Sequence, residues 1–173
     1  MSEPHLGERV VVSPVSNAPV MSSDNVFRYP LDVRFFEVDS LGVVFNMWYL
    51  GWCDEAMSAF LDSIGEGYAT LRAGGFDAVL RNAQIEWVDS LQAFQHAEIA
   101  VRVEHVGTTS FRLGYDIERV DIERADIGQV DPGGRGLSRC AQVAITYVCV
   151  EVDGRSKAPI PLGLRAALVK DHS

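Results

Sequence analysis

Residues 36–65 read FEVDSLGVVFNMWYLGWCDEAMSAFLDSIG, and the second half of this stretch decides which fold we expect. Apolar side chains recur there at the three- and four-residue spacings of one helix face: Leu50, Cys53, Met57, Phe60, Leu61 and Ile64. Polar side chains keep to a single stripe, formed by Asp54, Glu55, Ser58 and Asp62. Gly65 is suited to end the helix. We therefore predict a long, mostly buried helix that begins near residues 46–47.

Alternation of apolar and polar side chains predicts strands on both sides of this helix. The first strand is expected over residues 27–37. A short helical piece is expected at 66–73, followed by strands near 79–88, 97–104, 111–118 and 138–152. A sheet must bury one face, and one long apolar helix is available to cover it. The pattern therefore predicts an α+β fold in which a curved antiparallel sheet wraps around the helix.

Length and composition indicate a single domain. The 173 residues are enough for one sizeable core, and we place the domain at residues 26–170. Residues 1–25 contain three prolines among scattered polar residues and are expected to form a flexible leader. Residues 120–137 hold several acidic residues and exceed the usual length of a hairpin connection. We expect them to form a mobile acidic loop between the last two strands.

Charge and cysteine usage narrow the choice of partners. The formal net charge of −9 argues against nucleic acid or an anionic membrane surface as the main partner. No apolar run approaches the roughly 18 residues that a membrane span requires. The three cysteines, Cys53, Cys140 and Cys149, lack metal-like spacing, which indicates reduced thiols and a cytoplasmic location.

The segment 36–56 resembles the signature of the 4-hydroxybenzoyl-CoA thioesterase family and of the related YbgC-type acyl-CoA thioesterases. That signature runs Asp39, two residues, Gly42, two apolar residues, an aromatic residue, a polar residue and then Tyr49 at the start of the central helix. A looser likeness covers residues 27–165, including the exit at 153–161. The resemblance implies the hotdog fold, which is a curved antiparallel sheet around a long central helix. Asn46 departs from the pattern because YbgC-type relatives often carry His there.

By this resemblance the chain is an acyl-CoA thioesterase, and Asp39 is its catalytic carboxylate. A carboxylate can deprotonate water as a general base or attack the thioester directly as a nucleophile, and both roles stay open. The alternative from the residues alone is that Asp39 only caps a turn or the helix. The match of the whole motif favours catalysis over that alternative.

The thioester oxygen needs hydrogen-bond donors as it gains charge. By resemblance the backbone N–H of Asn46, at the helix N-terminus, is the main candidate, with the loop of Gly42, Val43 and Val44 beside it. Gly42 would allow close backbone approach or would serve the turn. The Asn46 side chain could contact the substrate or cap the helix. Tyr49 is expected to belong to the core and to line the acyl pocket or support the loop.

Further substrate contacts are expected from five more residues. Glu55 is a reserve catalytic carboxylate, because a second class of hotdog thioesterases uses a glutamate on the helix, although a salt bridge or a solvated stripe is the more ordinary role. Arg112, Arg155 and Lys157 could meet the phosphates of coenzyme A or could be solvated charges. Ser110 stands where relatives often have serine.

The resemblance also implies an assembly, because hotdog active sites typically form between subunits. We expect a homodimer or homotetramer that acts on an acyl-CoA and needs no metal or redox cofactor. Two alternatives remain: a thioesterase acting on acyl-carrier protein in lipid or polyketide synthesis, and a hotdog protein that binds acyl-CoA without hydrolysing it. A hydratase would need a histidine where the chain has Asn46.

Overall fold

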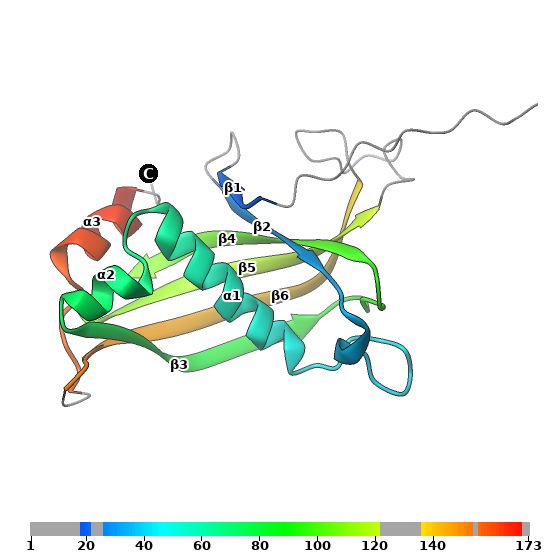
Figure 1. Cartoon of the computed structure of the whole chain (residues 1–173), viewed down its shortest axis with the longest axis horizontal. Coiled ribbons are helices and arrows are strands. Elements are labelled where there is room, and N and C mark those ends of the chain that lie inside the picture. The colour runs from blue at the N-terminus through cyan, green and yellow to red at the C-terminus, as the bar shows by residue number, and fades with distance from the viewer. Residues whose placement is uncertain (1–17, 22–25, 122–135, 154–155, 171–173) are drawn as a thin grey trace, which may run out of the picture.

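The computed structural model describes residues 18–21, 26–121, 136–153 and 156–170. Six antiparallel strands form one sheet in the order β1-β2-β4-β5-β6-β3, and the long helix α1 crosses one face of it (Figure 1). The elements are β1 (Val20–Met21), β2 (Phe27–Asp32), the 3-10 helix η1 (Phe35–Glu37), α1 (Trp48–Ser63), α2 (Tyr68–Ala73), β3 (Phe76–Trp87), β4 (His96–Val106), β5 (Ser110–Asp121), β6 (Gly136–Glu151) and α3 (Leu162–Lys170). The predicted α+β architecture is confirmed.

The core lies between α1 and the sheet. The side chains of α1 that contact the sheet are fully buried, as the three- and four-residue spacing predicts: Trp52, Cys53, Ala56, Met57, Phe60 and Leu61. They meet buried side chains of β5 and β6, namely Phe111, Leu113, Tyr115, Ile117, Val143, Ile145 and Tyr147. Gly65, with a φ of 79°, follows the helix as expected. All three cysteines are buried and unpaired.

The first strand is shorter than predicted, because β2 ends at Asp32 and residues 35–37 turn into η1. The cause is the Glu37 side chain, which accepts a 2.7 Å hydrogen bond from the Arg34 backbone N–H and also binds the Arg34 guanidinium. This local hydrogen bonding competes with the strand ladder. Phe35 and Phe36 consequently point to solvent, with exposures of 72% and 60%.

Both ends of the domain contain elements that sequence periodicity did not predict. The helix α3 follows Pro161 and packs through Leu164 and Leu168, which are spaced four residues apart and fully buried. Within the segment predicted to be a flexible leader, Val20 and Met21 pair with β2. Residues 1–17 and 22–25 of that leader, and residues 122–135 of the predicted acidic loop, lie outside the described residues. The described ends of that loop, 120–121 and 136–137, continue β5 and β6.

One edge of the sheet is β3, which pairs only with β6 among the described strands. Apolar side chains along and just after this edge are exposed: Val79, Leu80, Trp87 and Val88. Among the described helices, none is long and apolar enough to cross a membrane. The helices α2 and α3 lie near the C-terminal end of α1, and the loop that precedes α1 lies at its other end (Figure 1).

Candidate functional site

The loop that carries Asp39 is a small hairpin held by its own backbone. Val38 and Val44 form an antiparallel bridge, and the Asp39 N–H donates to the Val43 carbonyl at 2.8 Å. The Gly42 N–H donates back to the Asp39 carbonyl at 3.0 Å. Gly42 has a φ of 77°, a left-handed conformation that glycine adopts without steric cost. The prediction that Gly42 serves the turn is therefore confirmed.

The Asp39 side chain is half-buried and takes part in the same turn. Its Oδ1 accepts a 2.8 Å hydrogen bond from the Leu41 N–H. The turn role expected for an aspartate at this position is thus observed. It uses one of the two carboxylate oxygens, so the other remains available for chemistry.

Glu37 anchors this loop to α1. Its carboxylate is fully buried, and its Oε1 accepts a 2.9 Å hydrogen bond from the indole N–H of Trp52. Burial acts to raise the pKa of Glu37, but the hydrogen bonds from Arg34 and Trp52 outweigh it and hold the pKa below its ordinary value. The Glu37 carbonyl also accepts from the Phe45 N–H at 2.9 Å. Glu37 therefore joins the two ends of the loop through its carbonyl and ties the loop to the helix through its carboxylate.

The helix N-terminus leaves a donor at Asn46. The N-cap residue of α1 is Met47, which makes no side-chain capping bond, and the Trp48 N–H donates to the Phe45 carbonyl at 3.0 Å. The Asn46 N–H has no acceptor among the described residues. Its side chain is exposed and does not cap the helix, contrary to one of the two roles considered for it. A free N–H at the positive end of a helix is suited to bind an oxyanion.

A pocket of about 340 Å³ opens beside this donor. One side comes from the loop and α1, through Val44, Asn46 and Tyr49. The other side comes from the end of β3 and the residues after it: Trp87, Val88, Asp89 and Ser90. Tyr49 is buried in the core as predicted and also lines the pocket, where its ring lies edge-on to Trp87 at 6.3 Å. Asp39 is not a lining residue and lies on the adjoining turn.

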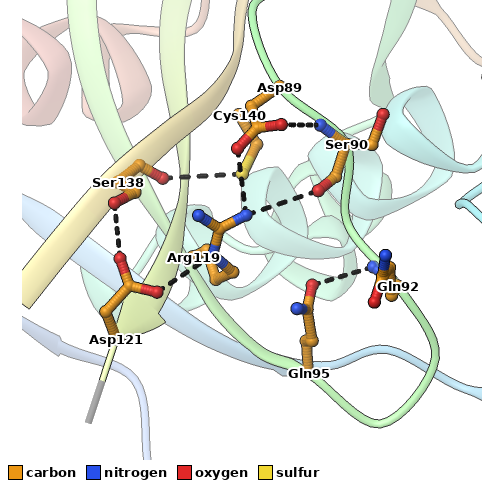
Figure 2. Close-up of polar contacts among 8 residues, drawn as sticks. All are labelled: Asp89, Ser90, Gln92, Gln95, Arg119, Asp121, Ser138 and Cys140. Atoms are coloured by element: carbon orange, nitrogen blue, oxygen red, sulfur yellow. Dashed lines mark hydrogen bonds and ion pairs between the residues drawn. The ribbon is translucent and has the colours of Figure 1, made fainter. Parts of the chain in front are cut away.

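Residues 88–90 form a pocket wall that was missing from the sequence prediction. The N–H groups of Val88 and Asp89 both donate to the Cys140 carbonyl of β6, at 2.8 and 3.0 Å. The Arg119 guanidinium of β5 contacts the Asp89 carboxylate at 3.0 Å (Figure 2). These partners lie 30 or more positions away along the chain. No local motif reveals the wall, because the register of β3, β6 and β5 brings its partners together.

The remaining predicted contacts that the structure describes lie away from the pocket in this chain. Glu55 is exposed on α1, where it pairs with Arg34 at 3.7 Å and accepts a hydrogen bond from Tyr29, as its ordinary role predicts. Ser110 begins β5 opposite Val148, at the far end of the strand from Arg119. Arg112 contacts Glu104 and Gln84. Lys157 is exposed, and Arg155 lies outside the described residues.

Known proteins resemble this chain both in sequence and in fold. A curated relative from Aquifex aeolicus (strain VF5), which carries a provisional esterase name, is 31% identical over 95 residues, or 55% of this chain and 74% of the relative. A 1,4-dihydroxy-2-naphthoyl-CoA thioesterase from Synechocystis superposes with a TM-score of 0.69 at 21% identity, covering 83% of this chain and 96% of that one.

The gentisyl-coenzyme A thioesterase BH1999 superposes with a TM-score of 0.66 at 22% identity, covering 82% of this chain and 98% of that one. These likenesses in structure show the shared fold. The family model described as the Thioesterase-like superfamily matches residues 33–168, a range that contains the Asp39 loop, α1 and the pocket wall. The chain therefore belongs to the Thioesterase-like superfamily.

Proposed function

We propose that the protein hydrolyses the thioester bond of an acyl-coenzyme A, releasing the free acid and the thiol of coenzyme A. The observation that carries the proposal is the free N–H of Asn46, which adjoins the pocket at the N-terminus of α1. Membership of the superfamily supports the same chemistry. Two proteins of the same fold are named as thioesterases for 1,4-dihydroxy-2-naphthoyl-CoA and gentisyl-coenzyme A.

In the proposed reaction the thioester oxygen binds the Asn46 N–H and the positive end of the α1 dipole. Charge develops on this oxygen as the carbonyl is attacked, so a preorganised donor stabilises the transition state more than the ground state. The donor is held in place because the Trp48 N–H is already bonded to the Phe45 carbonyl, which fixes the first turn. The acyl group would occupy the pocket between Tyr49 and Trp87.

Asp39 is the proposed carboxylate, acting as general base on water or as nucleophile. Its hairpin is continuous with the residues that line the pocket, because Val44 belongs to both. In this proposal the protein resembles the 4-hydroxybenzoyl-CoA and YbgC-type enzymes, and it uses no metal. Gly42 keeps the turn tight, and Val43 is bridged to Gln92 beside the pocket wall.

We further propose that the working unit is at least a homodimer joined through β3. A strand at a sheet edge offers unpaired N–H and carbonyl groups to a second copy. Trp87 and Val88, at the end of this edge, also line the pocket and have exposures of 50% and 61%. A second copy along β3 would cover them and bring other residues to the site. Ser110, Arg112, Arg155 and Lys157 then remain candidates for coenzyme A contacts within the assembly.

The decisive test is the Asp39→Asn variant, assayed by release of the coenzyme A thiol from a panel of aliphatic and aromatic acyl-CoA esters. Asparagine retains the Oδ1 acceptor for the Leu41 N–H, so the turn and the melting temperature should be preserved. We expect kcat to fall by about 100-fold or more, the range for loss of a general base. The matched control is Glu55→Gln, which removes the reserve carboxylate and should leave kcat within about two-fold, as expected for an exposed residue away from the pocket.

Four other outcomes would redirect the proposal. Wild-type turnover in Asp39→Asn would remove Asp39 from the mechanism, and loss of turnover in Glu55→Gln would transfer the role to the helix carboxylate. Tight binding of acyl-CoA without hydrolysis by the wild-type protein would indicate a binding module. Hydrolysis of acyl-carrier protein but not of acyl-CoA would identify the carrier-bound thioester as the substrate.

A further inference from the structure

The pocket wall presents a carboxylate whose position is fixed. Asp89 lines the pocket, and its side chain is 54% exposed. Its Oδ1 accepts from the Ser90 N–H at 2.8 Å, and its Oδ2 contacts the Arg119 guanidinium at 3.0 Å (Figure 2). A carboxylate accepts about four hydrogen bonds, so these two leave lone pairs that face solvent and the pocket.

Arg119 does not cancel the charge of this wall, because it is shared between two carboxylates. Its Nε donates to Asp121 at 3.0 Å, while its NH1 reaches Asp89. Asp121 in turn accepts a hydrogen bond from the Ser138 hydroxyl. Among the described residues that line the pocket, Asp89 is charged and none is cationic, so no lining residue offsets the charge of Asp89.

Both partners favour the ionised form of Asp89. The hydrogen bond from the Ser90 N–H, followed by that from Arg119, lowers the pKa of Asp89 below its ordinary value. The carboxylate is therefore charged throughout the neutral range. The backbone of the wall is equally fixed, since the Val88 and Asp89 N–H groups share the Cys140 carbonyl.

We propose that Asp89 is a specificity-determining residue that disfavours acyl groups ending in a carboxylate, and that Arg119 is the positioning residue that holds Asp89 in the pocket wall. This inference rests on the proposed thioesterase function. A second carboxylate bound about 6 Å from Asp89, at an effective dielectric constant of about 40, would meet repulsion worth about ten-fold in kcat/KM. An uncharged acyl group of the same length would meet none.

The test compares glutaryl-CoA with pentanoyl-CoA, which have acyl chains of equal carbon number but differ in the terminal carboxylate. We expect the wild-type protein to prefer pentanoyl-CoA, and Asp89→Asn to raise the glutaryl-to-pentanoyl ratio of kcat/KM by about ten-fold. Asp77→Asn is the matched control, because Asp77 forms the same kind of ion pair with Arg72 near the other end of β3. It should leave the ratio unchanged.

The role of Arg119 is tested by repeating Asp89→Asn in an Arg119→Gln background. If Arg119 positions Asp89, the effect of Asp89→Asn on the ratio should shrink to about two-fold or less, because the two residues act as a coupled pair. Arg119→Lys should restore most of the effect. A full ten-fold effect in the Arg119→Gln background would overturn the positioning role. Because the readout is a ratio within one protein sample, a general loss of stability does not imitate it.

The outcomes separate this inference from the function on which it rests. Hydrolysis of pentanoyl-CoA with an unchanged ratio in both Asp89→Asn and Asp89→Ser would overturn the inference and leave the proposed function standing. Absence of hydrolysis of any acyl-CoA by the wild-type protein would overturn both.

Discussion

Two segments face each other across the pocket, and they are held in different ways. The loop 38–46 is fixed mostly by bonds within itself and by Glu37, and it makes two long-range contacts, the Val43–Gln92 bridge and the hydrogen bond from the Val44 N–H to the Leu91 carbonyl. The wall 88–90 is fixed by Cys140 and Arg119, which lie on other strands. The loop carries the proposed catalytic carboxylate, while the wall carries the proposed selective one. The proposed chemistry thus depends mainly on local bonds, and the proposed recognition depends on long-range bonds.

The largest effect on this comparison is expected from Glu37→Ala, which removes the local anchor of the Asp39 loop. The variant loses the charge-assisted hydrogen bonds to Arg34 and leaves the buried indole N–H of Trp52 without its acceptor. We expect the free energy of unfolding to fall by about 3 kcal/mol, measured by urea denaturation. Thioester hydrolysis should fall in parallel, because the loop loses its attachment to α1.

Glu55→Ala is the control for that experiment, since Glu55 pairs with the same Arg34 on the exposed side of the helix. Glu55→Ala should lower the free energy of unfolding by less than about 1 kcal/mol, as for other exposed ion pairs. Equal losses in the two variants would contradict the view that the buried carboxylate is the anchor.

Lowering the pH should weaken the same anchor, the Glu37 carboxylate, but less than Glu37→Ala does. The pKa of Glu37 is lower in the folded protein than in the unfolded chain, so its contribution to stability is complete above the unfolded pKa. The contribution is lost as pH falls through the folded pKa. The protonated carboxyl still fills its site, so the loss should be smaller than in Glu37→Ala. The free energy of unfolding, measured from pH 7 into the acid range, should decline less steeply in Glu37→Gln than in the wild type.

The smallest effect is expected from backbone conformation within the loop. Gly42→Ala places a Cβ in open space but at a φ of 77°, so only conformational strain is added, and stability should fall by about 1 kcal/mol. Gly51→Ala is its counterpart on α1, where a Cβ also meets open space but φ is helical. It should stabilise the protein by about 0.5–1 kcal/mol. Thermal unfolding of both variants compares the two sites, and destabilisation by both would show that added bulk, not φ, is responsible.

What could be predicted from the sequence follows the same division between local and long-range interactions. The periodicity of neighbouring residues predicts the helix, most strands and the sheet–helix architecture. The prediction extends β2 too far because Val33 and Phe35 continue the alternation, whereas the Glu37 side chain diverts the backbone. The helix α3 was missed because only Leu164 and Leu168 mark its buried face.

The residues of the candidate site show the same division between local and distant determinants. Asn46 and Tyr49 were predicted near the pocket and line it, since a motif places them at the start of α1. The sequence alone does not single out Asp89, because an aspartate after a strand is ordinary. Its partner Arg119 can be identified only once β3, β6 and β5 are aligned in register.

The shared carbonyl of Cys140 has an evolutionary consequence. It holds the wall through the N–H groups of Val88 and Asp89, and almost any amino acid can supply such a group. Side chains at 88–90 can therefore be exchanged in duplicated genes while the wall keeps its place. The Asp39 loop, whose turn uses the side chain of Asp39 and the positive φ of Gly42, has less of this freedom. Under the proposed function, descendants of this protein can change which acyl group they accept before they change how they cleave it.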